Sequence, residues 1–232
     1  MGTLKSKIVI LHGWTYTLEK WNDFGKLLNI NGYEVEFLKI PGLSEKSDEV
    51  WDLEKYANWL DLKIGKNKVT LMGHSNGGRI ALFYASLHPE KITRLIVVDS
   101  AGIYHRNFTL QLKRFIFGTV AKVGKLVTES PGIKKFLYSL AREKDYNVAT
   151  PNMKKSMINL ITSDLKNILP KINVNTLIIW GSEDQITPLS DAYLMKNLIK
   201  NSQLVIIKGA RHSPFFTHPE KVQAAINKLN DI

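Results

Sequence analysis

Short, wholly apolar runs alternate with segments of helical spacing along most of this chain, and that alternation restricts the possible folds most strongly. Such runs are too short for helices and are typical of strands buried on both faces of a sheet. The predicted strands are Lys7–Leu11, Glu34–Ile40, Val69–Met72, Leu95–Val98, Leu177–Trp180 and Leu204–Ile207, and the predicted helices are Trp21–Ile30, Val50–Ile64, Asn76–Leu87 and Pro219–Leu229. The pattern predicts an α/β fold with a mostly parallel sheet and helices on both faces.

The alternation stops between Ile103 and Pro170, where only helical signals remain. Ser130-Pro131, Thr150-Pro151 and Ser163-Asp164 each resemble an N-cap that opens a helix. The stretch is too long for a plain loop. We therefore predict a core formed by residues 1–102 and 171–232, interrupted by a helical insertion over residues 103–170.

Positive charge is concentrated in the same stretch. The whole chain carries a formal net charge of +11, and residues 103–171 hold thirteen Lys or Arg against four Asp or Glu, so 13 − 4 = +9 lies there and 11 − 9 = +2 elsewhere. A cationic region of this kind suits an acidic partner, either nucleic acid or an acidic carrier of the substrate. Its aromatic residues follow helical core spacing, which disfavours nucleic-acid binding.

The composition excludes several classes of protein. The chain has no cysteine, so it has no disulfide, thiolate metal site or cysteine nucleophile. The longest apolar run near the start, Ile8–Leu11, is far shorter than the roughly 20 residues that a membrane span needs, and no signal-peptide pattern is present. We expect a cytoplasmic protein with no membrane partner.

One motif carries chemistry, and it lies between a predicted strand and a predicted helix. Gly73-His74-Ser75-Asn76-Gly77 follows the Val69–Met72 strand directly and has the form G-x-S-x-G. In that context the turn forces the serine into a strained conformation and lifts its hydroxyl above the sheet. The N-terminus of the following helix then faces the negative charge that develops during the reaction. Ser75 is therefore the predicted nucleophile.

A serine nucleophile needs a base and an acid that orients the base. Asp184 follows the Leu177–Trp180 strand, and His212 follows the Leu204–Ile207 strand. All three residues come after predicted strands, so one edge of a parallel sheet would bring them together. The chain order Ser, Asp, His is also that of known hydrolases.

With these motifs the chain resembles the α/β-hydrolase superfamily over nearly its whole length. The resemblance includes His12-Gly13-Trp14 after the first strand and a helical lid inserted into the core. It implies a sheet of about six strands, with the chain starting at what would be the third strand of the full family core. It also implies that the backbone N–H groups of Trp14 and Asn76 form the oxyanion hole.

Other polar residues near these motifs have structural interpretations. Asp99 also follows a strand and is an alternative acid, although a turn or capping role fits it better. In the resembling family His12 usually shapes the oxyanion loop, and we expect a structural role for His74 as well. The remaining histidines, for which we expect surface positions, are His88, His105 and His218. No metal-ligand spacing and no nucleotide-binding glycine motif occurs, so we predict no metal and no cofactor.

The candidate substrate contacts come from the insertion and the C-terminal region. The aromatic residues predicted to line an acyl pocket are Phe115, Phe136 and Phe215. The cations predicted to dock an acidic carrier are Lys113, Arg114, Lys122, Lys134, Lys135 and Arg142. Both sets also have a purely structural alternative. The aromatic residues can pack the lid onto the core, and the cations can cover solvated helix faces.

These features predict a serine carboxylesterase that works through an acyl-serine intermediate. The His12-Gly13-Trp14 motif and basic lid resemble the carboxylesterases that demethylate pimeloyl-acyl-carrier-protein methyl ester in biotin synthesis. That resemblance makes acyl carrier protein an alternative partner to a small free ester. A lactonase, a C–C hydrolase and a non-catalytic ligand receptor remain further alternatives, because the same three residues serve them all. We expect a monomer.

Overall fold

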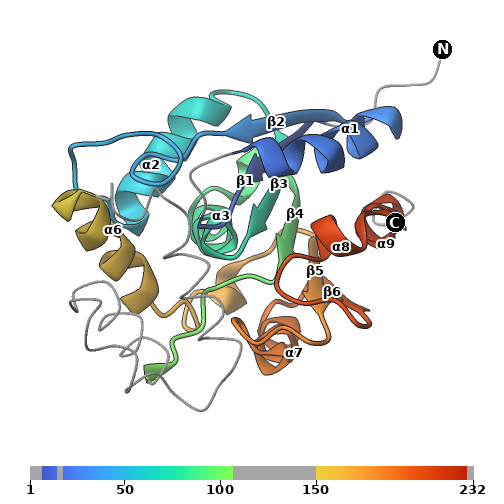
Figure 1. The fold of residues 1–232 in the computed structure, drawn as a ribbon. Coiled ribbons are helices and arrows are strands. Elements are labelled where there is room, and N and C mark those ends of the chain that lie inside the picture. The colour runs from blue at the N-terminus through green and yellow to red at the C-terminus, as the bar shows by residue number, and fades with distance from the viewer. Residues whose placement is uncertain (1–6, 15–17, 107–149, 229–232) are drawn as a thin grey trace, which may run out of the picture.

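A computed structural model gives the fold and describes residues 7–14, 18–106 and 150–228 (Figure 1). Its strands form one sheet in the order β2-β1-β3-β4-β5-β6, and every neighbouring pair is parallel. The strands are β1 (Lys7–Leu11), β2 (Glu34–Leu38), β3 (Val69–His74), β4 (Ile92–Val98), β5 (Thr176–Gly181) and β6 (Ser202–Ile207). The predicted parallel sheet of about six strands is confirmed.

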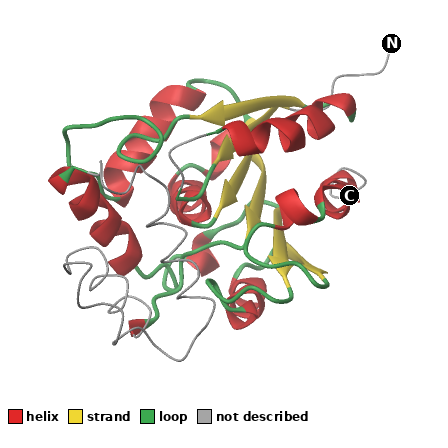
Figure 2. Ribbon diagram, in the orientation of Figure 1, coloured by secondary structure: helices red, strands yellow, loops and turns green. Residues whose placement is uncertain are grey.

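Helices cover both faces of this sheet (Figure 2). The α-helices are α1 (Asn22–Ile30), α2 (Leu53–Ile64), α3 (Asn76–Leu87), α6 (Pro151–Thr162), α7 (Leu189–Leu198), α8 (Pro214–Thr217) and α9 (Pro219–Lys228). The described residues also form three short 3₁₀ turns, which are η1 (Glu19–Trp21), η2 (Pro89–Lys91) and η5 (Leu169–Lys171). Apolar residues of α1 and α9 join one core cluster, whereas those of α2, α3 and α7 join the other.

Alternate residues of the strands supply these two clusters. In β1, Ile8 and Ile10 belong to the α1–α9 side, while Val9 and Leu11 belong to the α2–α3–α7 side. Successive side chains of a strand point to opposite faces, so a strand covered by helices on both sides must be apolar throughout. The wholly apolar runs in the sequence have this cause.

Local capping explains where some helices begin. Asp52 accepts a hydrogen bond from the Lys55 backbone N–H at 2.8 Å, so α2 begins at Leu53 and not at the predicted Val50. Thr150 caps α6 in the predicted way, through a 3.2 Å bond from the Met153 N–H.

The prediction that Ser163-Asp164 opens a helix is wrong. Ser163 ends α6, with its hydroxyl donating to the Asn159 carbonyl at 2.7 Å. The Asp164 carboxylate accepts the Lys166 backbone N–H at 3.2 Å, which forms a turn that leads to η5. Helices α7 and α8 were not predicted, because α7 follows a loop with no periodic signal and α8 is a single turn.

Helix α6 is attached to the loop that precedes α2. Its Ser156 hydroxyl accepts the Trp51 backbone N–H at 2.8 Å, and the Asn159 amide donates to the Trp51 carbonyl at 3.0 Å. The predicted helix at Ser130-Pro131 lies outside the described residues. The division into a core and an insertion over residues 103–170 stays a prediction. Within the part of the chain that the structure describes, no helix has both the length and the apolar character needed to cross a membrane.

The order of the strands reverses between β1 and β3. From β1 the chain moves to β2 at one edge, and it returns to place β3 on the other side of β1. In open α/β sheets a crevice forms at such a switch point, outside the carboxyl ends of the two strands. Here that position is flanked by His12-Gly13-Trp14 after β1 and by Ser75 after β3.

Candidate active site

Ser75 stands in a tight turn between β3 and α3. Its backbone has φ 54° and ψ −119°, and only one other non-glycine residue of the described chain, Asp99, has a positive φ. The Ser75 N–H donates to the Val98 carbonyl at 3.2 Å, and its carbonyl accepts the Ala101 N–H at 3.0 Å. The neighbouring strand β4 and the loop after it therefore hold the turn in this strained form.

The glycines of the motif are required by close backbone approach. A Cβ on Gly73 would lie 2.5 Å from the Gly77 carbonyl oxygen, and a Cβ on Gly77 would lie 2.5 Å from the His12 carbonyl oxygen. Such distances are below any ordinary van der Waals contact. The turn can bring β1, β3 and α3 together only because these positions lack side chains.

The three predicted catalytic side chains form one hydrogen-bonded chain. The Ser75 hydroxyl lies 3.0 Å from His212 Nε2, and His212 Nδ1 lies 2.8 Å from Asp184 Oδ2. With its proton on Nδ1, the imidazole donates to the carboxylate and accepts from the serine hydroxyl. The structure thus brings together residues that are 28 and 137 positions apart in the sequence.

The loops that carry the acid and the histidine are fixed against each other. The Glu183 N–H donates to the Ala210 carbonyl at 2.8 Å, and a Cβ on Gly181 would lie 2.5 Å from the Arg211 carbonyl oxygen. On the other side of the acid turn, the Trp180 indole N–H donates to the Thr187 carbonyl at 2.9 Å. These contacts set the separation of the acid from the base before any substrate arrives.

Asp184 has the environment of a charged acceptor. Its side chain is fully buried, which alone would raise its pKa, but the hydrogen bond and charge of His212 act against burial and the pKa is lowered overall. Further donors are the Thr187 hydroxyl at 2.6 Å and the Ile186 N–H at 2.8 Å. An ionised Asp184 can orient the imidazole and stabilise its positive charge.

Thr187 is a site residue that the sequence analysis missed. Its hydroxyl donates to Asp184, and it also lies 3.4 Å from His212 Nδ1. The available signal was its place three residues after the aspartate, where Asp side chains often bond the backbone of a turn. The Thr187 N–H does bond Asp184 Oδ1, at 3.2 Å.

Asp99 occupies the same edge of the sheet but has another function. One carboxyl oxygen accepts the Gly181 N–H at 2.8 Å, and the other has no hydrogen-bond partner within the described chain. Burial, followed by the charge of Asp184, raises the pKa of Asp99 well above its ordinary value. Its bond to the Gly181 N–H supports the start of the acid loop.

The two histidines interpreted as structural lie beside the catalytic residues. His74 Nε2 contacts the His212 carbonyl at 2.7 Å, and burial lowers the pKa of His74 to about 3. His12 Nδ1 lies 2.6 Å from the Gly13 carbonyl and Nε2 lies 2.6 Å from the Ser44 hydroxyl. Burial lowers the pKa of His12 to about 4, so both rings are neutral at pH 7 and fix the loops that carry them.

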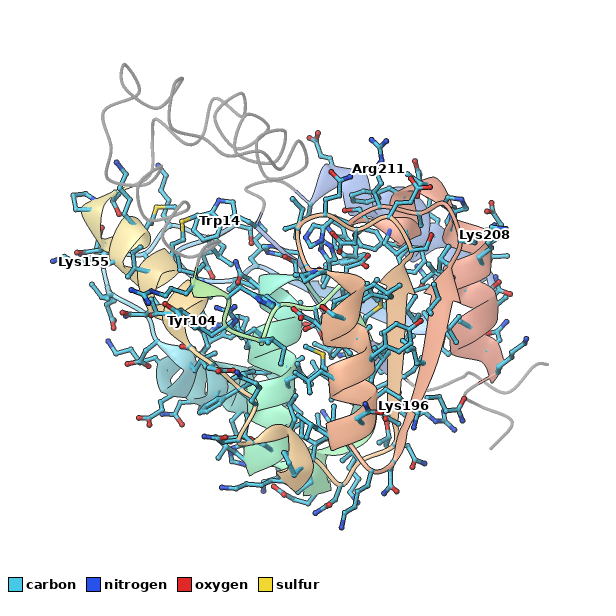
Figure 3. The ribbon with its side chains drawn as sticks, turned by 90° about the horizontal axis from the view of Figure 1, so that it is seen from below. Trp14, Tyr104, Lys155, Lys196, Lys208 and Arg211 are labelled. Atoms are coloured by element: carbon cyan, nitrogen blue, oxygen red, sulfur yellow. The ribbon has the colours of Figure 1, made fainter. Side chains whose placement is uncertain are left out.

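The predicted oxyanion donors lie on either side of Ser75. Asn76 is the first residue of α3, so its N–H has no acceptor within the helix, and no other acceptor for it occurs in the described residues. Gly13, directly before Trp14, is so close that a Cβ on it would lie 2.9 Å from the Ser75 Cβ. Figure 3 shows Trp14 at the same end of the molecule as Arg211, the neighbour of His212, with Lys196 at the opposite end.

The structure gives two further predicted residues, Phe215 and His105, a more specific environment. Phe215 is a core residue rather than an open pocket wall, because it is buried and stacks on Trp21 with ring centroids 4.0 Å apart. Its ring also packs edge-on against that of His74, next to Ser75, with the ring centroids 4.8 Å apart. His105, for which a surface position was expected, has a partly exposed side chain, and its Nε2 lies 2.9 Å from the carboxylate of Asp191.

Some predicted residues lie outside the described residues, and their roles stay predictions. They are the pocket residues Phe115 and Phe136 and the docking residues Lys113, Arg114, Lys122, Lys134, Lys135 and Arg142. Within the described chain, Lys155 is an exposed cation on α6, and Figure 3 shows it on the outer side of that helix. The absence of a metal or cofactor also stays a prediction.

Comparison with known proteins agrees with this architecture. A family model for the alpha/beta hydrolase fold matches residues 7–160 and 134–219. The pimeloyl-[acyl-carrier protein] methyl ester esterase of Wigglesworthia glossinidia brevipalpis is 28% identical over 240 residues, which cover 94% of this chain and 91% of that protein. The monoacylglycerol lipase ABHD6 of Mus musculus is 24% identical over 250 residues, covering 96% and 74% respectively.

A solved structure gives the same result at the level of the fold. The alpha/beta hydrolase MGS-M2, from a deep-sea metagenome library of the Medee basin, superposes with a TM-score of 0.77 at 22% identity. The match covers 100% of this chain and 92% of that one.

Proposed function

The chain belongs to the alpha/beta hydrolase fold family, and we propose that it is a serine carboxylesterase with Ser75 as its nucleophile. The observation that carries the proposal is the continuous hydrogen-bonded chain from Ser75 through His212 to Asp184. It lies beside the switch point of the sheet, where such folds bind their ligands. The likeness to curated esterases along 94% of the chain supports the same conclusion.

We assign each group a role in the first half of the reaction. His212 Nε2 removes the hydroxyl proton as Ser75 Oγ attacks the ester carbonyl, and Asp184 stabilises the imidazolium that forms. The backbone N–H groups of Trp14 and Asn76 receive the negative charge on the former carbonyl oxygen. Collapse of this intermediate releases the alcohol, which takes its proton from His212, and leaves an acyl-Ser75 ester.

Water completes the cycle by the same route. His212 takes a proton from a water molecule, whose oxygen attacks the acyl carbonyl at Ser75. The tetrahedral intermediate again places its charge on the oxyanion donors and then expels the serine, which recovers its proton from His212. The net reaction consumes one ester and one water and gives one acid and one alcohol.

A direct test is covalent labelling of the serine. A fluorophosphonate should modify Ser75 in the wild type, and the labelled enzyme should lose hydrolysis of p-nitrophenyl butyrate in proportion. Ser75→Ala should neither react nor hydrolyse the ester. If Ser75→Ala hydrolyses the ester at the wild-type rate, Ser75 is not the nucleophile. A wild type that takes no label and hydrolyses no ester would favour the ligand-receptor alternative.

For the substrate, we propose a methyl ester of an acyl chain carried by acyl carrier protein. The curated relative bears that activity in its name, and the +9 charge of residues 103–171 is complementary to an acidic carrier. A carrier-borne substrate requires both proteins in one compartment. The lack of cysteine fits the reducing cytoplasm.

The carrier is tested by comparing kcat/KM for methyl pimeloyl-acyl carrier protein with that for free dimethyl pimelate, each at low and high salt. Docking predicts a large preference for the carrier that shrinks with salt. Replacing Lys134, Lys135 and Lys155 with Gln should slow the carrier substrate and spare the free ester. The matched control combines Lys196→Gln, which Figure 3 shows at the end of the molecule opposite to Trp14, with Lys200→Gln just after α7. Equal effects on both substrates would exclude docking.

Free lipid esters are the second candidate substrate. The named activity of the monoacylglycerol lipase relative supports them, since it matches 96% of this chain. A panel containing monoacylglycerols, a lactone and a vinylogous C–C hydrolase substrate separates the remaining alternatives. The highest kcat/KM in that panel identifies the reaction class.

A further inference from the structure

Arg79 is the most unusual charged residue of the described chain. It lies in the first turn of α3, is only 4% exposed, and its Nε and Nη1 have no hydrogen-bond partner within the described residues. Two buried guanidinium nitrogens without partners are unfavourable, because they have lost their hydration and gained no acceptor. They call for an acceptor that the described residues do not supply.

Arg79 is cationic despite its burial. Burial lowers its pKa to about 10, and the charge of Asp164 raises it, so the guanidinium keeps its proton at pH 7. Among the described residues no hydrogen bond or ion pair joins Asp164 to Arg79, and both Asp164 oxygens contact Lys166 instead. The Lys166 N–H donates to Oδ1 at 3.2 Å, and Lys166 Nζ lies 3.2 Å from Oδ2.

The position of Arg79 relative to the nucleophile is defined by the backbone. The Arg79 N–H donates to the Ser75 carbonyl at 3.2 Å, so the two residues are one helical turn apart. One turn rises by about 5.4 Å, and residues four apart lie on the same face of a helix. Because helical side chains lean toward the N-terminus of their helix, the Arg79 side chain leans toward the Ser75 end of α3.

We propose that Arg79 binds a carboxylate carried by the ester substrate. The proposal rests on Ser75 acting as an esterase nucleophile. Among the candidate substrates it favours free esters that bear a second, free acid group over the carrier-borne methyl ester, which bears none. A planar guanidinium is the side chain best suited to a carboxylate, since it offers several N–H donors in a fixed arrangement. A half-ester of a dicarboxylic acid has the required chemistry, with one end neutral at Ser75 and the other end anionic at Arg79.

The competing explanation is that Arg79 is structural and held by the charge of Asp164. The two explanations differ in what happens when the charge is removed. Arg79→Met keeps much of the length and lacks the buried charge, so the carboxylate-site proposal predicts a melting temperature equal to or above that of the wild type. A structural ion pair predicts a lower melting temperature.

The decisive experiment compares kcat/KM of one enzyme for two esters, one with a free acid at its far end and one with a neutral group there. We expect kcat/KM of the wild type to be higher for monomethyl pimelate than for dimethyl pimelate. In Arg79→Met the ratio of these two values should fall about 10- to 100-fold, mainly through KM for the half-ester. Arg79→Lys should retain part of the ratio. The control is Arg94→Met. It removes a cation near the amino end of β4, whereas Ser75 follows the carboxyl end of β3, and it should leave the ratio unchanged.

A binding measurement separates this proposal from the proposed esterase function. Calorimetric titration of the Ser75→Ala variant with monomethyl pimelate should show binding. The same titration of the double variant, Ser75→Ala combined with Arg79→Met, should show none. If binding depends on Arg79 while no ester is hydrolysed by the wild type, the carboxylate site stands and the esterase proposal fails. If esters are hydrolysed but the ratio is the same in Arg79→Met, the carboxylate site is wrong and the esterase proposal stands.

Discussion

Asp99 and Asp184 are buried carboxyl groups at the same edge of the sheet, but only Asp184 contacts the imidazole of His212. Asp184 Oδ2 lies 2.8 Å from His212 Nδ1, whereas Asp99 accepts the backbone N–H of Gly181. Burial, followed by the charge of Asp184, raises the pKa of Asp99, whereas the hydrogen bond and charge of His212 lower that of Asp184. The same environment thus shifts the pKa values of the two acids in opposite directions.

Amide substitution should distinguish these two acids. Asp184→Asn should lower kcat by about 10⁴-fold, because the amide favours the wrong imidazole tautomer and cannot stabilise its charge. Asp99→Asn should change kcat by less than about 10-fold, since the amide oxygen can still accept the Gly181 N–H and Asp99 does not contact His212. Steady-state kinetics on p-nitrophenyl butyrate measures both. The reverse pattern would assign the catalytic acid to Asp99.

The oxyanion loop should be sensitive to a single methyl group. In Gly13→Ala the new Cβ would lie 2.7 Å from His74 Nδ1 and 2.9 Å from the Ser75 Cβ, so the loop that carries the Trp14 N–H must move. Loss of one oxyanion donor typically lowers kcat about 10²- to 10³-fold, and we expect a fall in that range.

Gly65→Ala is the control for that change. A Cβ at Gly65 meets nothing within 4 Å, but the backbone has φ +64°, so alanine there should cost about 1 kcal/mol of stability. It should leave kcat at the wild-type value. If Gly13→Ala also lowers only the stability and leaves kcat unchanged, the loop does not contribute to transition-state binding.

The sequence was sufficient to predict the sheet and the proximity of Ser75, Asp184 and His212, because both rest on local signals. The apolar runs report burial on two faces, and Ser75, Asp184 and His212 each directly follow such a run or its turn. The environment of Arg79 and the partner of His105 depend on segments distant in sequence, which no local pattern reports. Phe215 was misjudged for the same reason, since its stacking partner Trp21 lies in another part of the chain.

A substitution that relieves the backbone strain at Ser75 should raise the free energy of unfolding. Ser75 has φ 54°, a conformation that glycine adopts readily and alanine does not. Ser75→Gly should therefore be more stable than Ser75→Ala by about 1 kcal/mol in urea unfolding.

The matched pair at Ser86, inside α3, should show the opposite order. Ordinary helical positions favour alanine over glycine by about 1 kcal/mol, so Ser86→Ala should be the more stable variant. Finding Ala above Gly at both sites would mean that the turn at Ser75 stores no backbone strain.

His12 should make the protein sensitive to acid. Its pKa is about 4 in the folded chain, against an ordinary value of 6.5, because burial disfavours the charged ring. Between these values the unfolded chain binds the proton and the folded chain does not, so stability is fully present above pH 6.5 and is lost as pH falls toward 4.

Comparison with His12→Asn isolates this effect, because the other titrating groups are common to both proteins. The free energy of unfolding of the wild type, relative to the variant, should fall by about 1.4 kcal/mol per pH unit across this window. Urea unfolding at pH 7.5, 6.5, 5.5 and 4.5 measures it. Equal pH slopes would mean that the His12 ring is protonated in the folded state, and that its 2.6 Å contact with Ser44 Oγ then has the ring as donor.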